Sequence, residues 1–401
     1  MDIPQAFQFR LSRSLFIVIM LFMSLAQITA DMYTPSLPFI AHDLKSSPST
    51  IQMTLSIYML GFSLSHLYYG PLSDRIGRRS PILQGISLCM IGSLFCVFAP
   101  SIVFIMLGRL IQGLGMGACG SVGRPLLRDI LSGGQLAKLG SNMGMINVFV
   151  VASAPALGGY LQHYLGWRAI FFALFIYSSF VFLLTWKWLP ESNFHLNPHA
   201  TKLNFLIKNY RTVLTNKTFL GYSLCSSFSF AGLIAYATVA PFLLQSVVGL
   251  TPVQFGWLSF LIACSLFISM YLNTLFILQK GIAAMVLTGV VMMLLGGLLM
   301  IMFTLPGWIN TFVIMLPVFF FAMGAGFTFA NSFAGAFHPF PNMAGSAGAL
   351  YGCLQIFGAS VISALIALLP IHNQTPLALV FLALGLLSLL AFKRLVTNYT
   401  Y

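Results

Sequence analysis

One carboxylate lies inside an apolar stretch of a sequence that otherwise keeps its acidic residues in loops or at chain ends. Of the 6 acidic residues in the 401-residue chain, Asp31 is the one that falls within a run long enough to cross a membrane. An ionised carboxylate in hydrocarbon costs roughly 3 kcal/mol or more, so Asp31 is expected to face the interior of a helix bundle and bind a proton or a cation. A second interpretation is a carboxylate that caps a helix end, because Pro35 and Pro38 soon end the helix.

Arg109 is the matching basic residue, since it is the one Lys or Arg expected deep inside a span. At about 1.5 Å of rise per residue, Asp31 and Arg109 differ in depth by roughly 6 Å, which a long arginine side chain can bridge. Two interpretations remain open. Arg109 pairs with Asp31 directly, or it donates to backbone carbonyls near Gly113, Gly115 and Gly117. A buried carboxylate beside a cation can take up and release a proton, because burial favours its neutral form and attraction its ionised form.

The composition indicates a membrane protein. Hydrophobic residues make up 59% of the chain and charged residues only 6%, whereas soluble globular proteins carry about 25% charged residues. Twelve apolar runs have about the 20 residues that a helix needs to cross a bilayer. They are 14–36, 50–70, 80–99, 101–123, 140–162, 167–188, 218–245, 253–278, 282–304, 308–332, 345–369 and 375–394. The expected fold class is an all-α membrane protein with twelve transmembrane helices.

The basic residues predict the orientation and argue against a nucleic-acid partner. With both termini in the cytoplasm, every Lys and Arg except Lys45, Arg168 and the intramembrane Arg109 lies on the cytoplasmic side, as positive charges do in membrane proteins. The net charge of +13 is then explained by topology and by anionic membrane lipid, which is the expected partner surface. Residues 1–30 imitate a secretory signal, but eleven further spans follow, so the first helix is expected to stay uncleaved.

The longest polar connection divides the predicted spans into two sets of six. It covers residues 190–217 and is rich in Asn, Pro and Lys. We therefore expect an N-terminal six-helix half at 1–189, a cytoplasmic linker at 190–217 and a C-terminal six-helix half at 218–401. Two halves of similar size are typical of transporters built from repeats, whose substrate site lies between the halves near the middle of the membrane.

The turn after the second span combines an acid with several arginines. Its sequence is GPLSDRIGRR, residues 70–79. Asp74 can accept hydrogen bonds from a neighbouring helix N-terminus, while Arg75, Arg78 and Arg79 can bind carboxylates or lipid phosphate, which would form a latch at the cytoplasmic face. The simpler alternative is a positively charged turn that only orients its helices. Because that alternative does not need the aspartate, the latch is favoured.

The fifth span carries ASAPALGG, residues 152–159. Pro155 removes one backbone hydrogen bond, and Gly158 with Gly159 allows a neighbouring helix to approach closely. We expect these three residues to act as a gate element that shapes how the halves meet at the outer face. Glycine packing without any switching role is the alternative.

These segments resemble the major facilitator superfamily. The family's loop motif G-x-L-a-D-r-x-G-r-k is matched at Gly70, Leu72, Asp74, Arg75, Gly77 and Arg78. Residues 109–117, RLIQGLGMG, are similar to its fourth-helix motif, and residues 152–159 are similar to its fifth-helix antiporter motif, with Ala154 where the common form has Gly. DMYTPSLP, RPLLRDIL and HPFPNMAGSAGALYG are similar to the twelve-helix drug:proton antiporters, in particular the bicyclomycin and chloramphenicol resistance branch.

The resemblance implies a role for Arg109 in proton coupling, and a transporter that works as a monomer. It departs from the family pattern at the loop between the eighth and ninth spans, where only QKG, residues 279–281, stands in place of a second loop motif.

The residues that could contact a substrate are polar or aromatic and carry no charge. Near mid-membrane the C-terminal spans contain no ionisable residue. A mostly apolar cavity with one carboxylate suits a lipophilic neutral or cationic small molecule. The candidate cavity residues are Tyr33, Tyr58, Gln112, Tyr236, Asn331 and Gln355. The 6 Cys lack metal-ligand spacing and are interpreted as packing residues, so no metal site is expected.

Together these features predict a multi-pass protein of the bacterial inner membrane that exports lipophilic small molecules, as in multidrug efflux, in exchange for protons. No enzymatic activity and no cofactor are expected, because the proton gradient supplies the energy. The same fold also serves a dedicated exporter of a secreted metabolite such as a siderophore, or a proton symporter for uptake, so both remain open. Substrate profile and transport direction distinguish these three functions.

Overall fold

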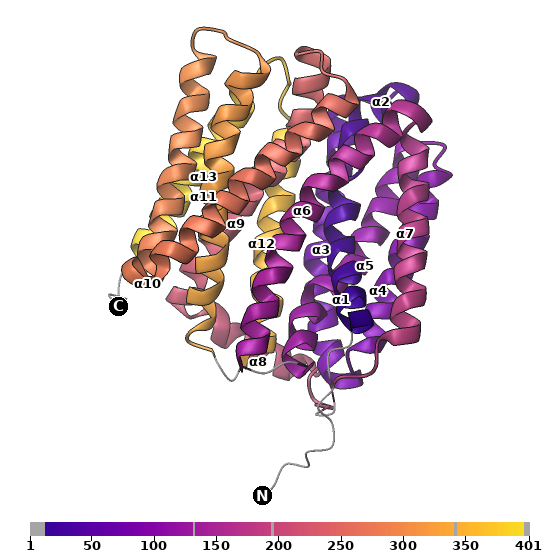
Figure 1. Cartoon of the computed structure of the whole chain (residues 1–401), viewed down its shortest axis with the longest axis vertical. Helices are drawn as coiled ribbons and strands as arrows, with labels where there is room; N and C mark the ends of the chain where they lie inside the picture. Colours follow the sequence, from indigo (N-terminus) through magenta and orange to yellow (C-terminus); the bar gives the residue numbers. More distant parts are fainter. Residues whose placement is uncertain (1–12, 131–132, 194–195, 341–342, 397–401) are drawn as a thin grey trace, which may run out of the picture.

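The computed structural model describes residues 13–130, 133–193, 196–340 and 343–396, and these residues form helices and short connections with no strand among them (Figure 1). The elements in chain order are α1 (Arg13–Asp31), the 3-10 turn η2 (Thr34–Ser36), α2 (Leu37–Asp43), α3 (Pro48–Ile76), α4 (Arg79–Val97), α5 (Ile102–Ile130), α6 (Gly133–Leu165), α7 (Trp167–Trp188), α8 (Leu203–Leu214), α9 (Lys217–Ala240), the π-helical turn η3 (Pro241–Val247), α10 (Pro252–Thr304), α11 (Thr311–Phe337), α12 (Ala344–Ala367) and α13 (Thr375–Leu395).

The predicted fold class is confirmed. Among the described residues, 9 helical segments are long and apolar enough to cross a membrane. One of them, α10, has 53 residues, or about 80 Å of helix, more than twice the thickness of the hydrocarbon core. Gly281 interrupts α10 with a φ of 76°, so this element supplies two crossings. Together with α3 of 29 residues and α6 of 33 residues, the described elements account for twelve crossings.

Two predicted spans end five residues earlier than the sequence pattern indicates. The first was expected at 14–36, but α1 ends at Asp31 and the chain continues through η2 and α2. The seventh was expected at 218–245, but α9 ends at Ala240 and Pro241 begins η3. The physical reason is the same at both places, because a proline lacks the N–H that the next helical hydrogen bond requires. Asp31 therefore lies at the last residue of its helix.

The linker contains a helix that the sequence analysis did not predict. Residues 190–217 were expected to form a polar connection, whereas α8 occupies Leu203–Leu214 within it. One face of α8 buries Val213, and Tyr210 Oη donates to Leu67 O of α3 over 3.4 Å. The expected cytoplasmic termini, residues 1–12 and 397–401, lie outside the described residues.

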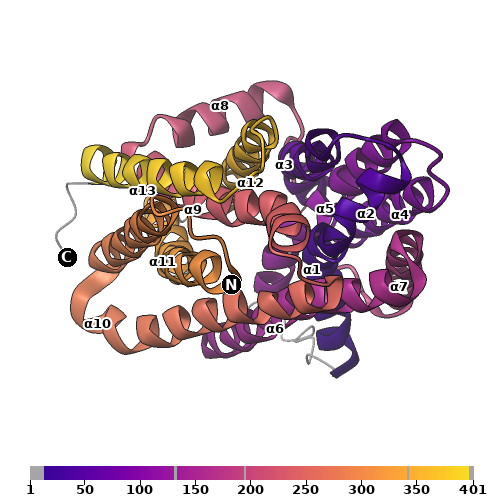
Figure 2. The same cartoon turned by 90° about the horizontal axis from the view of Figure 1, so that it is seen from above.

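The helices form two groups that lie side by side (Figure 2). Helices α1 to α7 lie on one side and α9 to α13 on the other, and contacts of α3 with α12 and of α6 with α10 join the groups. Buried apolar side chains fill each group. We call the end of the bundle that carries α8 the α8 end, and the opposite end, which carries α2, the α2 end (Figure 1).

Candidate functional site

Arg109 of α5 is held between two aromatic rings in the interior of the first group of helices. Its side chain is fully buried, at 0% exposure. The guanidinium carbon lies 4.1 Å from the ring centre of Tyr33 and 4.2 Å from that of Tyr58. A cation between two ring faces is stabilised by the quadrupole of each ring. These contacts join the turn after α1 and the helix α3 to Arg109.

Hydrogen bonds fix the direction of the guanidinium. Arg109 Nη1 donates to the backbone oxygen of Thr29 over 2.8 Å and to Gln112 Oε1 over 2.9 Å. Gln112 Nε2 in turn donates to Ser93 Oγ of α4 over 2.9 Å. Gln112 therefore helps to hold the guanidinium of Arg109 in place. In the described part of the chain, Nε and Nη2 of Arg109 are buried without a hydrogen-bond partner.

Arg109 bonds the α1 backbone two residues before Asp31, but among the described residues it does not pair with the Asp31 carboxylate. Of the two interpretations that the sequence left open, the structure supports donation to a backbone carbonyl, although the carbonyl is that of Thr29 rather than one near the glycines of α5. Gln27 Nε2, one helical turn earlier on α1, donates to Asp31 Oδ2 over 2.6 Å. Asp31 is 9% exposed. The 3 ion pairs among the described residues involve other carboxylates.

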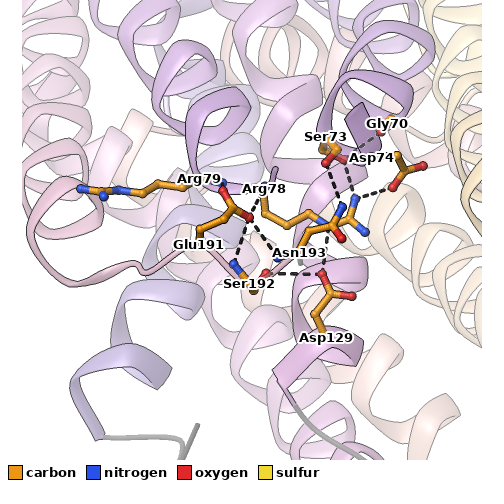
Figure 3. Close-up of polar contacts among 9 residues, drawn as sticks. All are labelled: Gly70, Ser73, Asp74, Arg78, Arg79, Asp129, Glu191, Ser192 and Asn193. Carbon is orange, nitrogen blue, oxygen red and sulfur yellow. Dashed lines mark hydrogen bonds and ion pairs between the residues drawn. The ribbon is translucent and has the colours of Figure 1, made fainter. Parts of the chain in front are cut away.

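A cluster of charged and polar groups surrounds Arg78 at the α8 end (Figure 3). Arg78 Nη1 pairs with Asp74 Oδ1 at 2.6 Å and donates to Ser73 Oγ over 2.7 Å. Its Nε pairs with Asp129 Oδ2, at the end of α5, over 3.0 Å. Burial disfavours the charged form of Arg78, but the carboxylates of Asp74 and Asp129 hold its pKa above the usual value. The guanidinium thus joins α3 and α5 through a permanently charged centre.

Glu191 is a member of this cluster that the sequence analysis treated as an ordinary loop acid. Its Oε1 accepts the backbone N–H of Arg78 over 2.7 Å, and its Oε2 accepts that of Arg79 over 3.2 Å (Figure 3). The same carboxylate accepts N–H groups of Ser192 and Asn193. Since α4 has no side-chain cap of its own, Glu191 satisfies N–H groups that every helix start leaves free.

Gly77 makes room for that cap. Its φ is +97°, a conformation that glycine adopts readily, and a Cβ at this position would collide with the Glu191 carboxylate. A sequence signal existed, because Arg78, the residue before the first residue of α4, is not a Ser, Thr, Asp or Asn that could cap the helix. That signal does not show which acid, distant in sequence, supplies the missing acceptor.

The sequence predicts a turn at residues 70–79, but α3 continues to Ile76, so only residues 77 and 78 separate it from α4. Residues 70–79 also contact the second group of helices and the linker. A Cβ at Gly70 would lie 3.3 Å from Ala349 Cβ of α12, and one at Gly345 would lie 3.2 Å from Asp74 Oδ2. Asp74 thus lies beside the first turn of α12. Arg75 Nη1 donates to Thr201 Oγ1 of the linker over 2.9 Å.

Arg79 is directed away from the cluster. Its side chain extends in the opposite direction from Asp74 and Asp129 (Figure 3) and donates from Nη2 to the backbone oxygen of Trp186 in α7. The sequence predicts that Arg75, Arg78 and Arg79 act together, but the structure directs the side chain of each to a different partner.

Glycines of α6 lie against backbone at the α2 end. A Cβ at Gly158 would collide with the Met32 carbonyl oxygen just after α1, and a Cβ at Gly159 would collide with that of Pro252 in α10. Pro155 O lies 2.6 Å from where a Cβ at Gly256 would be. Side chains at these positions would force α6 away from both neighbours.

The α2 end also carries neutral hydrogen bonds between the two groups, which the sequence analysis did not identify. Gln52 Nε2 of α3 donates to Thr238 O of α9 over 3.0 Å. Ser56 Oγ donates to Ser363 Oγ of α12 over 2.8 Å, and Ser360 Oγ donates to Ser56 O over 2.8 Å. Serine and threonine are common inside apolar helices, so their pairing across two groups could not be recognised from the sequence alone.

Three of the predicted cavity residues gather at Arg109, namely Tyr33, Tyr58 and Gln112. The other three lie in the second group of helices, each with its own polar partner. These contacts are Tyr236 Oη to Met315 Sδ (3.3 Å), Asn331 Nδ2 to Asn273 Oδ1 (2.7 Å) and Gln355 Nε2 to Ser226 Oγ (2.8 Å). Within the described ranges, no three His, Cys, Asp or Glu side chains lie together in a way that could hold a metal ion.

Comparison with known proteins places this arrangement in a family. Residues 17–364 match the family described as Major Facilitator Superfamily. The chain is 31% identical to multidrug resistance protein D of Escherichia coli, covering 97% of both chains, and 28% identical to the bicyclomycin resistance protein homolog of Haemophilus influenzae, covering 90% of this chain and 91% of that one. Its fold is similar to that of the Escherichia coli xylose transporter XylE in a partially occluded inward-open conformation, with a TM-score of 0.73, 13% identity, and 96% and 97% of the two chains covered. The chain belongs to the major facilitator superfamily of membrane transporters.

Proposed function

We propose that this protein is a proton-coupled antiporter of the inner membrane that exports lipophilic neutral or cationic small molecules. One observation carries the proposal. Asp31 is a buried carboxylate at a helix end, a fully buried arginine bonds the backbone two residues before it, and the carboxylate forms no ion pair in the described part of the chain. Relatives named as a multidrug resistance protein and a bicyclomycin resistance protein homolog support export of such molecules.

The coupling follows from competition at Asp31. A proton and a cationic or hydrogen-bonding substrate cannot both occupy the carboxylate, so binding of one favours release of the other. Arg109 lowers the electrostatic cost of the ionised carboxylate without blocking it, because its own bond goes to the Thr29 carbonyl. Transport then requires that proton and substrate stabilise different conformations, since a ligand shifts an equilibrium only through its differential affinity.

The six predicted cavity residues take two roles in this proposal. Tyr33, Tyr58 and Gln112 hold Arg109 in place and thereby position the coupling site. The other three, Tyr236, Asn331 and Gln355, remain candidates for contact with substrate, because they present polar atoms within a largely apolar group of helices.

The α8 end is the cytoplasmic side, and its charged cluster is the latch. The latch comprises Gly70, Asp74, Arg75, Gly77 and Arg78, with Arg79 contributing its backbone N–H to Glu191. The beginning of α12 beside Asp74 is the partner that this latch engages. The chain then acts as one monomer with halves 1–189 and 218–401, connected by the linker 190–217.

The α2 end is the outer side, where Pro155, Gly158 and Gly159 form the gate element. Gly158 packs against Met32 within the first half, while the contacts of Pro155 and Gly159 with α10 bring the two halves together there. Because these contacts involve no charge, they can separate without leaving an unpaired ion in the membrane.

Transport in proteoliposomes tests the proposal. The purified protein is reconstituted with an imposed pH gradient, and a panel of lipophilic cations and neutral antibiotics is followed. Movement of a panel compound opposite to the proton flow, lost in an Asp31→Asn variant, is the expected result. Movement in the same direction as protons would contradict antiport. Absence of movement for the whole panel would contradict multidrug export and direct attention to metabolites that the host secretes.

A further inference from the structure

A groove between α4 and α7 at the α8 end has polar groups on one wall and aromatic rings on the other. It has a volume of about 590 Å³ and is lined from α4 by Arg79, Ser80, Leu83 and Gln84, and from α7 by Phe182 and Trp186. Ser80, Leu83 and Gln84 lie one, four and five positions after Arg79, so the four residues share one face of α4. The groove is separate from the Asp31 site, and it shares Arg79 and Glu191 with the edge of the latch.

Arg79 brings an available positive charge to this groove. Its Nη2 donates to the Trp186 carbonyl, while its Nε is buried and has no hydrogen-bond partner among the described residues. None of the ion pairs in the described ranges includes Arg79. Glu191 also borders the groove, but its carboxylate already accepts four backbone N–H groups.

The groove faces away from the second group of helices. Helices α4 and α7 lie at the periphery of the bundle (Figure 2). Trp186 is 59% exposed, and Phe180 and Leu183 of the same helix are also exposed. In a membrane-spanning protein such apolar side chains contact lipid, and a tryptophan near a helix end is typical of the membrane interface.

We propose that this groove binds a phospholipid, with the phosphodiester on Arg79 and the first part of an acyl chain against Phe182 and Trp186. A guanidinium matches phosphate oxygens with two parallel donors. Ser80 and Gln84 supply further hydrogen-bonding groups beside it. A free phosphate ion would offer Arg79 the same oxygen atoms as a lipid phosphodiester. It would leave the aromatic wall without a partner, so we take a phospholipid as the ligand.

The binding would connect lipid composition to the transporter's latch. The backbone N–H of Arg79 is held by Glu191, whose other oxygen holds Arg78. A lipid that fixes the Arg79 side chain therefore stabilises the start of α4, on which the latch is built. This consequence rests on the proposed function, whereas lipid binding itself does not.

Fluorescence quenching at Trp186 tests the site. A variant that retains Trp186 as its only tryptophan is studied in micelles containing a brominated phospholipid, phosphatidylglycerol, or a brominated glycosyl diacylglycerol, which lacks phosphate. We expect the phospholipid to quench at a severalfold lower mole fraction. Arg79→Gln should remove this difference, and Lys187→Gln, which removes a neighbouring charge outside the groove, should keep it.

Equal quenching by both lipids in the parent protein, or a preference that survives Arg79→Gln, would overturn the proposal. Native mass spectrometry of the full chain with its own tryptophans provides the second readout, should the single-tryptophan variant fail to fold. It should show retained phosphatidylglycerol that Arg79→Gln loses. An inorganic phosphate adduct that depends on Arg79, without retained phospholipid, would assign the site to a soluble anion and contradict the lipid.

Discussion

Asp31 and Asp74 each belong to a site that contains an arginine, and of these two aspartates only Asp74 forms an ion pair with it. At the α8 end, Asp74 and Arg78 form an ion pair at 2.6 Å, and Asp129 completes the coordination of the same guanidinium. In the interior, Asp31 accepts from Gln27, and Arg109 donates to a backbone carbonyl and to Gln112. The same two residue types therefore produce two different electrostatic arrangements.

On the proposed function, this difference separates a region that fixes the positions of helices from a region where a carboxylate gains and loses a proton. Protonating Asp74 would break a bond that positions α3 against the start of α4, so its ionised state is tied to structure. Protonating Asp31 breaks no ion pair, and two buried donors of Arg109 remain without partners in the described residues. A buried polar network with unpaired donors is a site where binding of a proton or a ligand can change which hydrogen bonds form.

Asp31→Asn is expected to have the largest effect. The amide keeps the size of the side chain but can bind neither a proton nor a cation by charge, so gradient-driven export should fall to the passive leak. Transport into inverted membrane vesicles measures this, with insertion checked by the amount of protein in the membrane. Asp43→Asn, which alters an exposed ion pair with Arg168, is the matched control and should transport normally. Unchanged coupled transport by Asp31→Asn would remove the distinction between the two aspartates.

Arg109→Gln is expected to have the next largest effect. It removes a cation held by two tyrosine rings, and each such buried contact contributes up to about 2 kcal/mol, so coupling should fall about tenfold or more. Arg109→Lys should recover part of the activity, since it restores the charge but cannot reproduce the planar contact. Export rates under a fixed pH gradient provide the measurement. Full activity in Arg109→Gln would show that Asp31 works without a neighbouring cation.

Gln27→Leu should have a smaller effect, which depends on pH. Gln27 donates to the Asp31 carboxylate, and a hydrogen bond to a charged group contributes about 1.5–3 kcal/mol. Loss of this hydrogen bond leaves the ionised form of Asp31 less stable. Binding of a lipophilic cation should therefore weaken at neutral pH and recover as the pH rises. Equilibrium binding over a pH series tests this expectation, and a weakening that is equal at every pH would indicate a purely structural role for Gln27.

Asp74→Asn is expected to have the smallest effect of the four. Asp74 is partly exposed, and partly exposed ion pairs contribute about 0–1 kcal/mol, so turnover should slow severalfold at most while substrate binding is largely kept. Transport rate and binding affinity, measured on the same preparation, separate these effects. Normal turnover would mean that residues 70–79 serve only to orient the helices in the membrane.

The sequence predicted helix positions well because each span is a long apolar run with polar ends. It also drew attention to Asp31, Arg109 and residues 70–79 as candidate sites, since charged residues are rare in such runs, although it placed a turn where α3 continues to Ile76. It could not show that Arg109 bonds the Thr29 carbonyl, because that depends on how α1 and α5 are rotated against each other. The Glu191 cap joins segments more than 100 residues apart in sequence, and local patterns carry no information about such pairs.

The proposed linker shows a different limit. Helix α8 is short and has mixed composition, so its formation depends on packing of Val213 and Tyr210 against other helices. Isolated helices of this length are marginal in water. Its presence therefore could not be predicted from propensity alone, whereas the polar character of the segment could.

Proton release on substrate binding tests the central claim most directly. Purified protein in weakly buffered detergent solution is mixed with a lipophilic cation that it binds, and the pH change is recorded with an indicator dye. The parent protein should release protons, and Asp31→Asn should release none, while Asp74→Asn should behave as the parent. Release that persists in Asp31→Asn would contradict the assignment of Asp31 as the carboxylate at which proton and substrate compete.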